Sequence, residues 1–171
     1  MKRLASAHSS GAAYLDTAAG AMELAYPHRR SLASSTAFAD VGAARAWLHT
    51  HWRNVVALAE ADPTRSAVAV SGLLADYLDE RSHCDTALAL HELARATAEK
   101  SGDRTGEGTA LNHLALIDRR QGQYEAALDK HARALAAFRE VADRGGEGRA
   151  PRPEHGPLAA GQLPRLVRGA A

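Results

Sequence analysis

The chain of 171 residues is long enough for one domain or a short array of repeats, and its single cysteine, Cys84, excludes an internal disulfide framework. Its 21 Lys and Arg nearly balance its 20 Asp and Glu, which argues against a strongly basic surface for nucleic acid. Hydrophobic residues make up 46% of the chain and aromatic residues only 5%, which favours closely packed helices over β-sheets. The sequence has neither an apolar run long enough to span a membrane nor the apolar core of a signal peptide, which predicts a cytoplasmic protein.

The first 36 residues contain a helical segment and a polar connection. Residues 12–26 have a composition compatible with a helix, and Pro27 would end it because proline cannot continue a helix. Residues 31–36 are rich in serine. We therefore expect residues 1–36 to form an N-terminal helix and a linker, outside the main helical domain.

A long amphipathic helix follows, with Asp40 as its candidate N-cap. Its apolar side chains recur at the spacing of one helix face, namely Ala44, Trp47, Leu48, His51, Val55 and Leu58. Trp52 lies five residues after Trp47 and therefore off this face. We expect Trp47 in the core and Trp52 at the surface, where it could mark a docking site.

The next helix begins at Asp62-Pro63, where aspartate supplies an N-cap and proline the first helical position. Its apolar face is formed by Val70, Leu73, Leu74 and Tyr77. A partner helix starts near Ser82 and Asp85, which have the spacing of a capping box. It ends before Gly102.

The middle of the chain repeats itself after 40 residues. Residues 102–110 and 142–150 are identical at six of nine positions. The same shift aligns four further places: Leu74 with Leu114, Ala87-Leu88 with Ala127-Leu128, His91 with His131, and Ala94 with Ala134. In the second copy Gly122, at a left-handed cap position, separates two apolar helix faces. The first face consists of Leu111, Leu114, Ala115 and Ile117. The second consists of Tyr124, Ala127, Leu128, His131, Ala134, Leu135, Phe138 and Val141. We therefore expect repeated helix pairs.

These residues resemble the tetratricopeptide repeat family in its long-period variety. The resemblance is carried by Leu114-Ala115 in the first helix, Gly122 and Tyr124 at the turn, and Ala127 and Ala134 where helices approach. The earlier copy departs, since Ser82 replaces the turn glycine and Cys84 the aromatic residue. The resemblance covers residues 63–150 and implies an all-α solenoid, with a repeat domain over residues 37–150. The packing positions that it implies are Leu74, Ala87, Leu88, Ala94, Leu114, Ala115, Gly122, Tyr124, Ala127 and Ala134.

Short segments upstream of the repeats carry a second resemblance. They are Tyr26-Pro27-His28-Arg29-Arg30, Phe38-Ala39-Asp40, Ala46-Trp47-Leu48 and Asn54-Val55-Val56. Together they are similar to part of the large actinobacterial regulators of the AfsR type, transcriptional activators with an NB-ARC ATPase module and a C-terminal tetratricopeptide array. The resemblance implies that the chain is a fragment or remnant of the sensor end of such a regulator, with an NB-ARC module as a candidate partner. His51 and Arg53 depart from the residues usual there.

The last 21 residues break the repeat. Pro151 stands where the 40-residue shift requires the counterpart of Leu111, and four of the six prolines lie in this segment. Because a proline inside a helix costs about 3 kcal/mol, we expect residues 151–171 to form a disordered tail. Two origins stay open, a reading frame lost near Ala150 or a natural disordered terminus. Either would leave an open end of the array through which copies could associate.

The sequence offers no recognisable catalytic, cofactor-binding or metal-binding constellation. Residues 102–108 are rich in glycine, but the phosphate-loop pattern is not met, so we interpret them as a turn between helices. His91 and His131 occupy equivalent places in apolar stripes, which favours packing between helices over metal binding. Cys84 and His91 lie about 10 Å apart along one helix, too far for a nucleophile and its base. We expect no enzyme activity, cofactor or metal.

We interpret the array as a non-catalytic scaffold for protein–protein interaction and, by the second resemblance, as the sensor of a signal-responsive transcriptional regulator. In the tetratricopeptide family the first helix of each unit lines a groove, which implies four groove residues here: Tyr77, Asn112, Asp118 and Arg119. The alternative is an accessory regulator that binds nucleic acid through Arg29, Arg30 and the basic tail. The balanced charge and the lack of a helix-turn-helix signature weigh against it.

Overall fold

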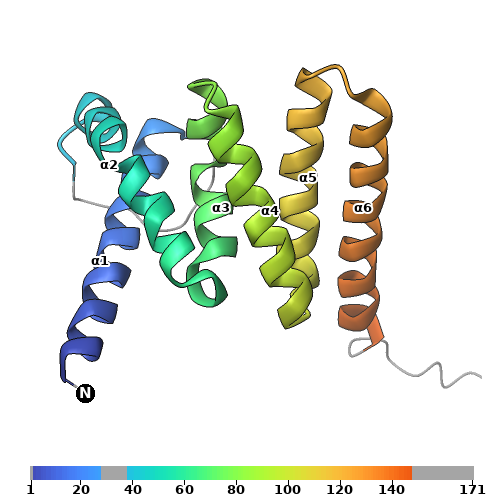
Figure 1. The fold of residues 1–171 in the computed structure, drawn as a ribbon, viewed down its shortest axis with the longest axis horizontal. Coiled ribbons are helices and arrows are strands. Elements are labelled where there is room, and N and C mark those ends of the chain that lie inside the picture. Colours follow the sequence, from blue (N-terminus) through green and yellow to red (C-terminus); the bar gives the residue numbers. More distant parts are fainter. Residues whose placement is uncertain (1, 28–37, 148–171) are drawn as a thin grey trace, which may run out of the picture.

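The computed structural model describes residues 2–27 and 38–147, and every regular element within these ranges is a helix (Figure 1). The helices are α1 (Lys2–Ala25), α2 (Val41–Ala61), α3 (Pro63–Glu80), α4 (Cys84–Ser101), α5 (Arg104–Arg120) and α6 (Tyr124–Glu147). The all-α prediction is confirmed for this part of the chain. The expected linker at residues 31–36 and the expected tail at residues 151–171 lie outside the described residues.

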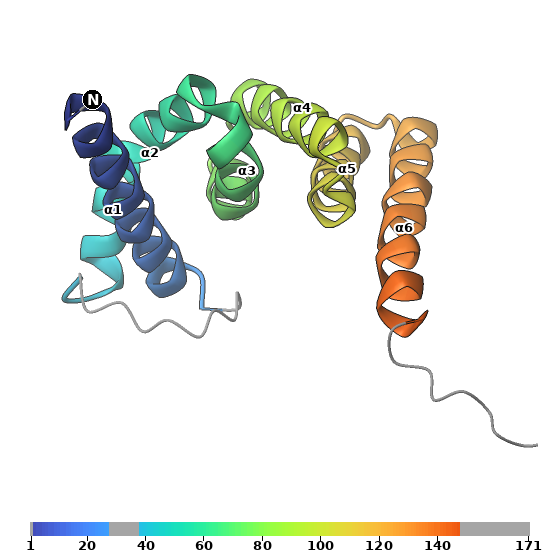
Figure 2. The same ribbon diagram turned by 90° about the horizontal axis from the view of Figure 1, so that it is seen from below.

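The helices pack as three helical hairpins, α1 with α2, α3 with α4 and α5 with α6. In Figure 1 they stand side by side in an elongated array, with α1 at one end and α6 at the other. The first helices of successive hairpins also touch, because α1 contacts α3 and α3 contacts α5. When the array is turned by 90° (Figure 2), α3 and α5 lie on one side, and α4 on the other. This arrangement is the α-solenoid that the repeat predicts.

Capping residues begin two of the helices where expected from the sequence. The Asp40 side chain accepts a hydrogen bond from the Ala43 amide at 2.8 Å, which confirms Asp40 as the N-cap of α2. Pro63 is the first residue of α3, also as predicted, and Asp62 stands at the N-cap position but makes no side-chain capping hydrogen bond. The predicted capping box at the start of α4 is wrong, because Ser82 precedes the N-cap, which is His83.

Ser82 instead reproduces the turn that Gly122 makes in the second copy. Its φ is +56° and that of Gly122 is +77°, both in the left-handed region. The amides that follow donate equivalent hydrogen bonds, from His83 to the Leu78 carbonyl at 2.9 Å and from Gln123 to the Asp118 carbonyl at 2.8 Å. The two turns therefore have the same geometry, although a side chain at a left-handed position costs about 1–2 kcal/mol.

The glycine-rich segment is only in part a turn. Gly102, with a φ of +72°, ends α4, whereas Gly106 and Gly108 lie inside α5. A Cβ at Gly106 would lie 2.8 Å from a methyl carbon of Val68 on α3, and one at Gly108 would lie 2.8 Å from the Phe138 ring on α6. These glycines therefore allow α5 to approach its neighbours closely.

The second copy does not repeat the end of the first. Ala142 stands 40 residues after Gly102 and lies inside α6, which continues to Glu147. Alanine is the best helix former and does not favour the left-handed cap that ends α4. Residues 148–150, the last three of the repeated segment, lie outside the described residues.

One hydrophobic core runs from α1 through α4 and reaches Ile117 on α5. Ala18 and Met22 of α1 are buried in it together with Leu48 of α2 and Leu74 of α3. The N-terminal helix therefore shares its core with the repeats, across the domain boundary expected at residue 36.

The exposures of Trp52, Leu88 and Tyr124 differ from the sequence-based expectations. Trp52 is buried at 5% exposure, because it stacks on His83 with ring centroids 4.5 Å apart and its other neighbours include the Arg53 guanidinium. It therefore marks no docking surface. Leu88 and Tyr124, expected at packing positions, are 40% and 65% exposed. Within the described ranges no helix follows α6, so nothing there covers Tyr124.

The strained turn yields a stability prediction. We expect Ser82→Gly to raise the free energy of unfolding by about 0.5–1 kcal/mol, because glycine adopts a positive φ without steric cost. The matched control is Gly122→Ser, whose side chain would meet open space and which should lower stability by about the same amount. Urea unfolding followed by circular dichroism measures both. A destabilised Ser82→Gly variant would contradict the turn geometry.

Candidate functional site

The four residues expected to line a groove do not share one surface. Asn112 and Arg119 are exposed on α5 and lie seven residues apart, which places them on one side of the helix two turns from each other. Tyr77 and Asp118 are buried, with exposures of 3% and 5%. The structure therefore leaves two of the four accessible to a partner.

Tyr77 belongs to the core side of α3. Its ring lies 6.3 Å from those of both Trp52 and His83, measured between centroids. In the second copy its counterpart 40 residues later is Ile117, which is also buried. The repeat itself therefore carried the signal that this position is internal. Within the described part of the chain the Tyr77 hydroxyl is buried and has no hydrogen-bond partner.

Asp118 joins α5 to α6. Its carboxylate forms an ion pair with the Lys130 ammonium group, and the two side chains are 7% and 23% exposed. The counterpart of Asp118 in the first copy is Leu78, which is fully buried. A buried carboxylate requires a compensating charge. This ion pair therefore links the two helices of the third hairpin, and its carboxylate is not available to a ligand.

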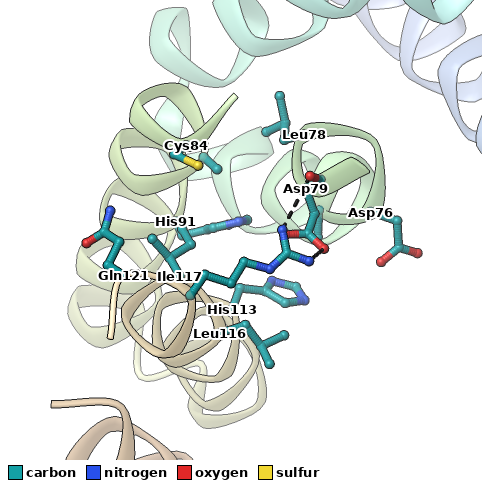
Figure 3. A pocket seen from close by; sticks show the side chains of 12 residues that line it. Asp76, Leu78, Asp79, Cys84, His91, His113, Leu116, Ile117 and Gln121 are labelled. Atoms are coloured by element: carbon teal, nitrogen blue, oxygen red, sulfur yellow. Dashed lines mark hydrogen bonds and ion pairs between the residues drawn. The ribbon is translucent and has the colours of Figure 1, made fainter. Parts of the chain in front are cut away.

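A pocket of about 170 Å³ lies between the C-terminal halves of α3 and α5, with α4 beneath it (Figure 3). Helix α3 supplies Asp76 and Asp79, and α5 supplies His113 and Leu116. Its remaining walls are Ala75, Leu78, Cys84, Ala87, His91, Ile117, Arg120 and Gln121. A cavity of about 150 Å³ accommodates a benzene ring, so this pocket has room for one apolar side chain.

An ion pair crosses the pocket between the two first helices. The Arg120 guanidinium binds the Asp79 carboxylate and also reaches the Asp79 carbonyl at 3.4 Å. Both side chains are almost half exposed, so that solvent screens their attraction. The pair gives the otherwise apolar pocket a polar rim.

Two histidines lie in the wall of the pocket. His91 is 2% exposed and its Nδ1 lies 2.7 Å from the Ser71 hydroxyl oxygen, so the prediction that it packs between helices is confirmed. Its ring is 4.8 Å from that of His113 on α5, between centroids. His131, its counterpart in α6, is only half-buried. No set of three or more His, Cys, Asp or Glu side chains that could hold a metal ion occurs among the described residues.

The exposed side of α5 adjoins the pocket and forms one continuous surface with it. Asn112 lies one turn before Leu116 and Arg119 one turn after it, and all three are exposed or half-buried. On α3, Asp76 and Asp79 are the counterparts of Leu116 and Arg119. The resulting surface has an apolar centre, carboxylates on the α3 side and a guanidinium on the α5 side.

Arg29, Arg30 and residues 151–171, which the nucleic-acid alternative requires, lie outside the described residues. No helix in the described part of the chain is long and apolar enough to cross a membrane.

The sequence model of the tetratricopeptide repeat family matches residues 52–140. No curated protein and no solved structure matches the chain. The matched range begins within α2 and includes α3, α4, α5 and most of α6, so it contains the whole pocket.

The unpartnered hydroxyl of Tyr77 yields a second prediction. We expect Tyr77→Phe to leave the free energy of unfolding unchanged or raise it by up to about 1 kcal/mol, because a buried donor without an acceptor is lost. The control is Tyr26→Phe, since the Tyr26 hydroxyl donates to the Glu80 carboxylate at 2.5 Å, and it should cost about 1–2 kcal/mol. Thermal and urea unfolding measure both. A large loss in Tyr77→Phe would show that its hydroxyl has a partner.

Burial of Tyr26 and its hydrogen bond to Glu80 also raise the pKa of the Tyr26 phenol above its ordinary value. The phenol therefore stays protonated and able to donate throughout the neutral pH range in which these variants would be compared.

Proposed function

The chain belongs to the tetratricopeptide repeat family, and we propose that it is a non-catalytic module that binds a protein partner on the exposed face of α3 and α5. Stacked helical repeats of this kind serve as scaffolds that present an extended surface to a peptide or helix. The observation that carries the proposal is the pocket between α3 and α5, which opens on this face.

The chemistry of the face indicates what a partner must offer. An apolar side chain would enter the pocket beside Leu116 and His113, where it would lose contact with water. An acidic group next to it would lie toward Arg119, and a basic group toward Asp76. A short segment with an apolar anchor between charged neighbours fits this pattern best, because buried anchors contribute most of the affinity at interfaces.

We also propose a regulatory setting, in which the array is the sensor of a signal-responsive transcriptional regulator and restrains or releases an NB-ARC ATPase module. Its support is the sequence pattern of Tyr26-Pro27, Trp47-Leu48 and Asn54-Val55-Val56, which resembles regulators of the AfsR type. The neighbourhood of the gene tests this proposal. We expect a P-loop ATPase encoded directly upstream, and its absence would count against the regulatory setting but not against partner binding.

The proposed face predicts how variants change peptide binding. Peptides selected from a random display library on the full chain should lose at least about tenfold in affinity with Leu116→Glu, which places a charge in the pocket wall, and with Arg119→Ala. Val41→Glu is the matched control, because Val41 is an exposed apolar residue on α2. Fluorescence anisotropy measures the affinities. Equal binding by all three variants would place the site elsewhere.

The same preparation tests the nucleic-acid alternative. A protein that binds DNA through Arg29, Arg30 and a basic tail would show affinity that falls steeply with salt. We expect weak binding to a DNA duplex without a steep salt dependence. Strong, salt-sensitive binding would favour the alternative.

A further inference from the structure

Helix α6 has two apolar faces, one buried against α5 and one largely exposed, although the Phe138 ring of the exposed face also lies against Gly108 of α5. Its alanine face packs against α5, with Ala127, Ala134 and Ala137 between 3% and 5% exposed. The other, here called the outer row, consists of Tyr124, Leu128, His131, Leu135 and Phe138. Apart from the half-buried His131, its members are 39% to 68% exposed. By helical spacing alone the two faces form one apolar stripe in the sequence.

The preceding hairpin shows what covers such a row. Forty residues earlier, the counterparts of the outer row lie on α4, and two of them, His91 and Ala98, are almost completely buried. Helix α5 packs on α4 there, with the His113 ring against that of His91. The outer row therefore corresponds to a helix-accepting position of the first repeat at His131 and Phe138, whereas the counterparts of Tyr124 and Leu128 on α4, Cys84 and Leu88, are exposed. It also carries larger apolar side chains than α4, with Tyr124 in place of Cys84 and Phe138 in place of Ala98.

Residues of the outer row are spaced alternately by four and three positions. This is the spacing with which two helices pack side chains into each other along a shared line. The row extends from Tyr124 to Phe138, about 21 Å at 1.5 Å per residue. A row of this length fits a second helix better than a short extended peptide.

Charges beside the outer row indicate the direction of that helix. Glu125, Ala132 and Arg139 flank the row at intervals of seven residues, and all three are exposed. Ala132 is the midpoint between the two charges. If two copies of α6 lie antiparallel about this midpoint, Glu125 of each copy faces Arg139 of the other. In a parallel pair the flanks that carry Glu125 and Arg139 would lie on opposite sides of the contact, so these charges would not pair with each other.

We propose that α6 is a homodimerisation helix, which pairs antiparallel with α6 of a second protein molecule through the outer row. In this register Leu128 of one molecule packs against Phe138 of the other molecule, and Leu135 packs against His131 of the other molecule. Two reciprocal Glu125–Arg139 ion pairs flank the contact, and their attraction sets the direction more than the affinity. The surface is self-complementary, as a two-fold interface requires. It lies apart from the pocket between α3 and α5, so the proposal does not depend on the binding function of that face.

Sedimentation equilibrium on the full chain tests the pairing. We expect the wild type to be dimeric at about 100 μM and Leu128→Glu to weaken association by at least about tenfold. Leu88→Glu is the matched control, because Leu88 is the counterpart of Leu128 on α4 and is also exposed; it should remain dimeric. Circular dichroism establishes that each variant is folded. A monomeric wild type, or a fully dimeric Leu128→Glu variant, would overturn the proposal.

The charge pattern tests the direction without altering the apolar row. Glu125→Arg and Arg139→Glu should each weaken self-association, because like charges then face each other across the pair. An equimolar mixture of the two variants should form a heterodimer with nearly wild-type affinity, since opposite charges face each other at both ends. Failure of the mixture to associate, or undiminished self-association of the single variants, would exclude the antiparallel register.

Discussion

Close approach of helices through small side chains is the constraint on which the whole array depends. Ala94 and Ala98 on α4, and Ala110 and Ala115 on α5, are almost completely buried. Gly106 and Gly108 allow a closer approach than alanine would, because a Cβ at either position would overlap a neighbouring side chain. Small residues bring helix axes close enough for their ridges and grooves to interlock.

This constraint also positions the candidate site. Because α3 and α5 both pack on α4, their C-terminal halves are held side by side with a space between them above Cys84 and Ala87. The pocket is therefore formed by three helices of two hairpins, with an ion pair between Arg120 and Asp79 at its rim. A pocket that is already open needs no rearrangement of the backbone to admit a side chain, which limits the entropy lost on binding.

Much of the fold could be predicted from local chemistry. Asp40 and Pro63 mark helix starts, and Gly122 marks a turn, because capping and left-handed geometry depend on a few neighbouring atoms. The candidate site was less accessible to prediction. Asn112 and Arg119 are exposed, but Tyr77 and Asp118 are not, since a polar group on the first helix can face either a neighbour or solvent. Asp118 is buried because Lys130, on another helix, compensates its charge.

The sequence by itself determined the helical class, the 40-residue repeat and the periodic spacing of the apolar residues, because these follow from the chain's own periodicity. Only the tertiary structure decided which part of a stripe is covered. On α6 the alanine face is buried and the row from Tyr124 to Phe138 is open, although both have helical spacing. Trp52 shows the converse, since it lies off its predicted stripe and is buried by His83 of the next hairpin. Periodicity defines faces about one helix axis, whereas burial depends on where neighbouring helices pack.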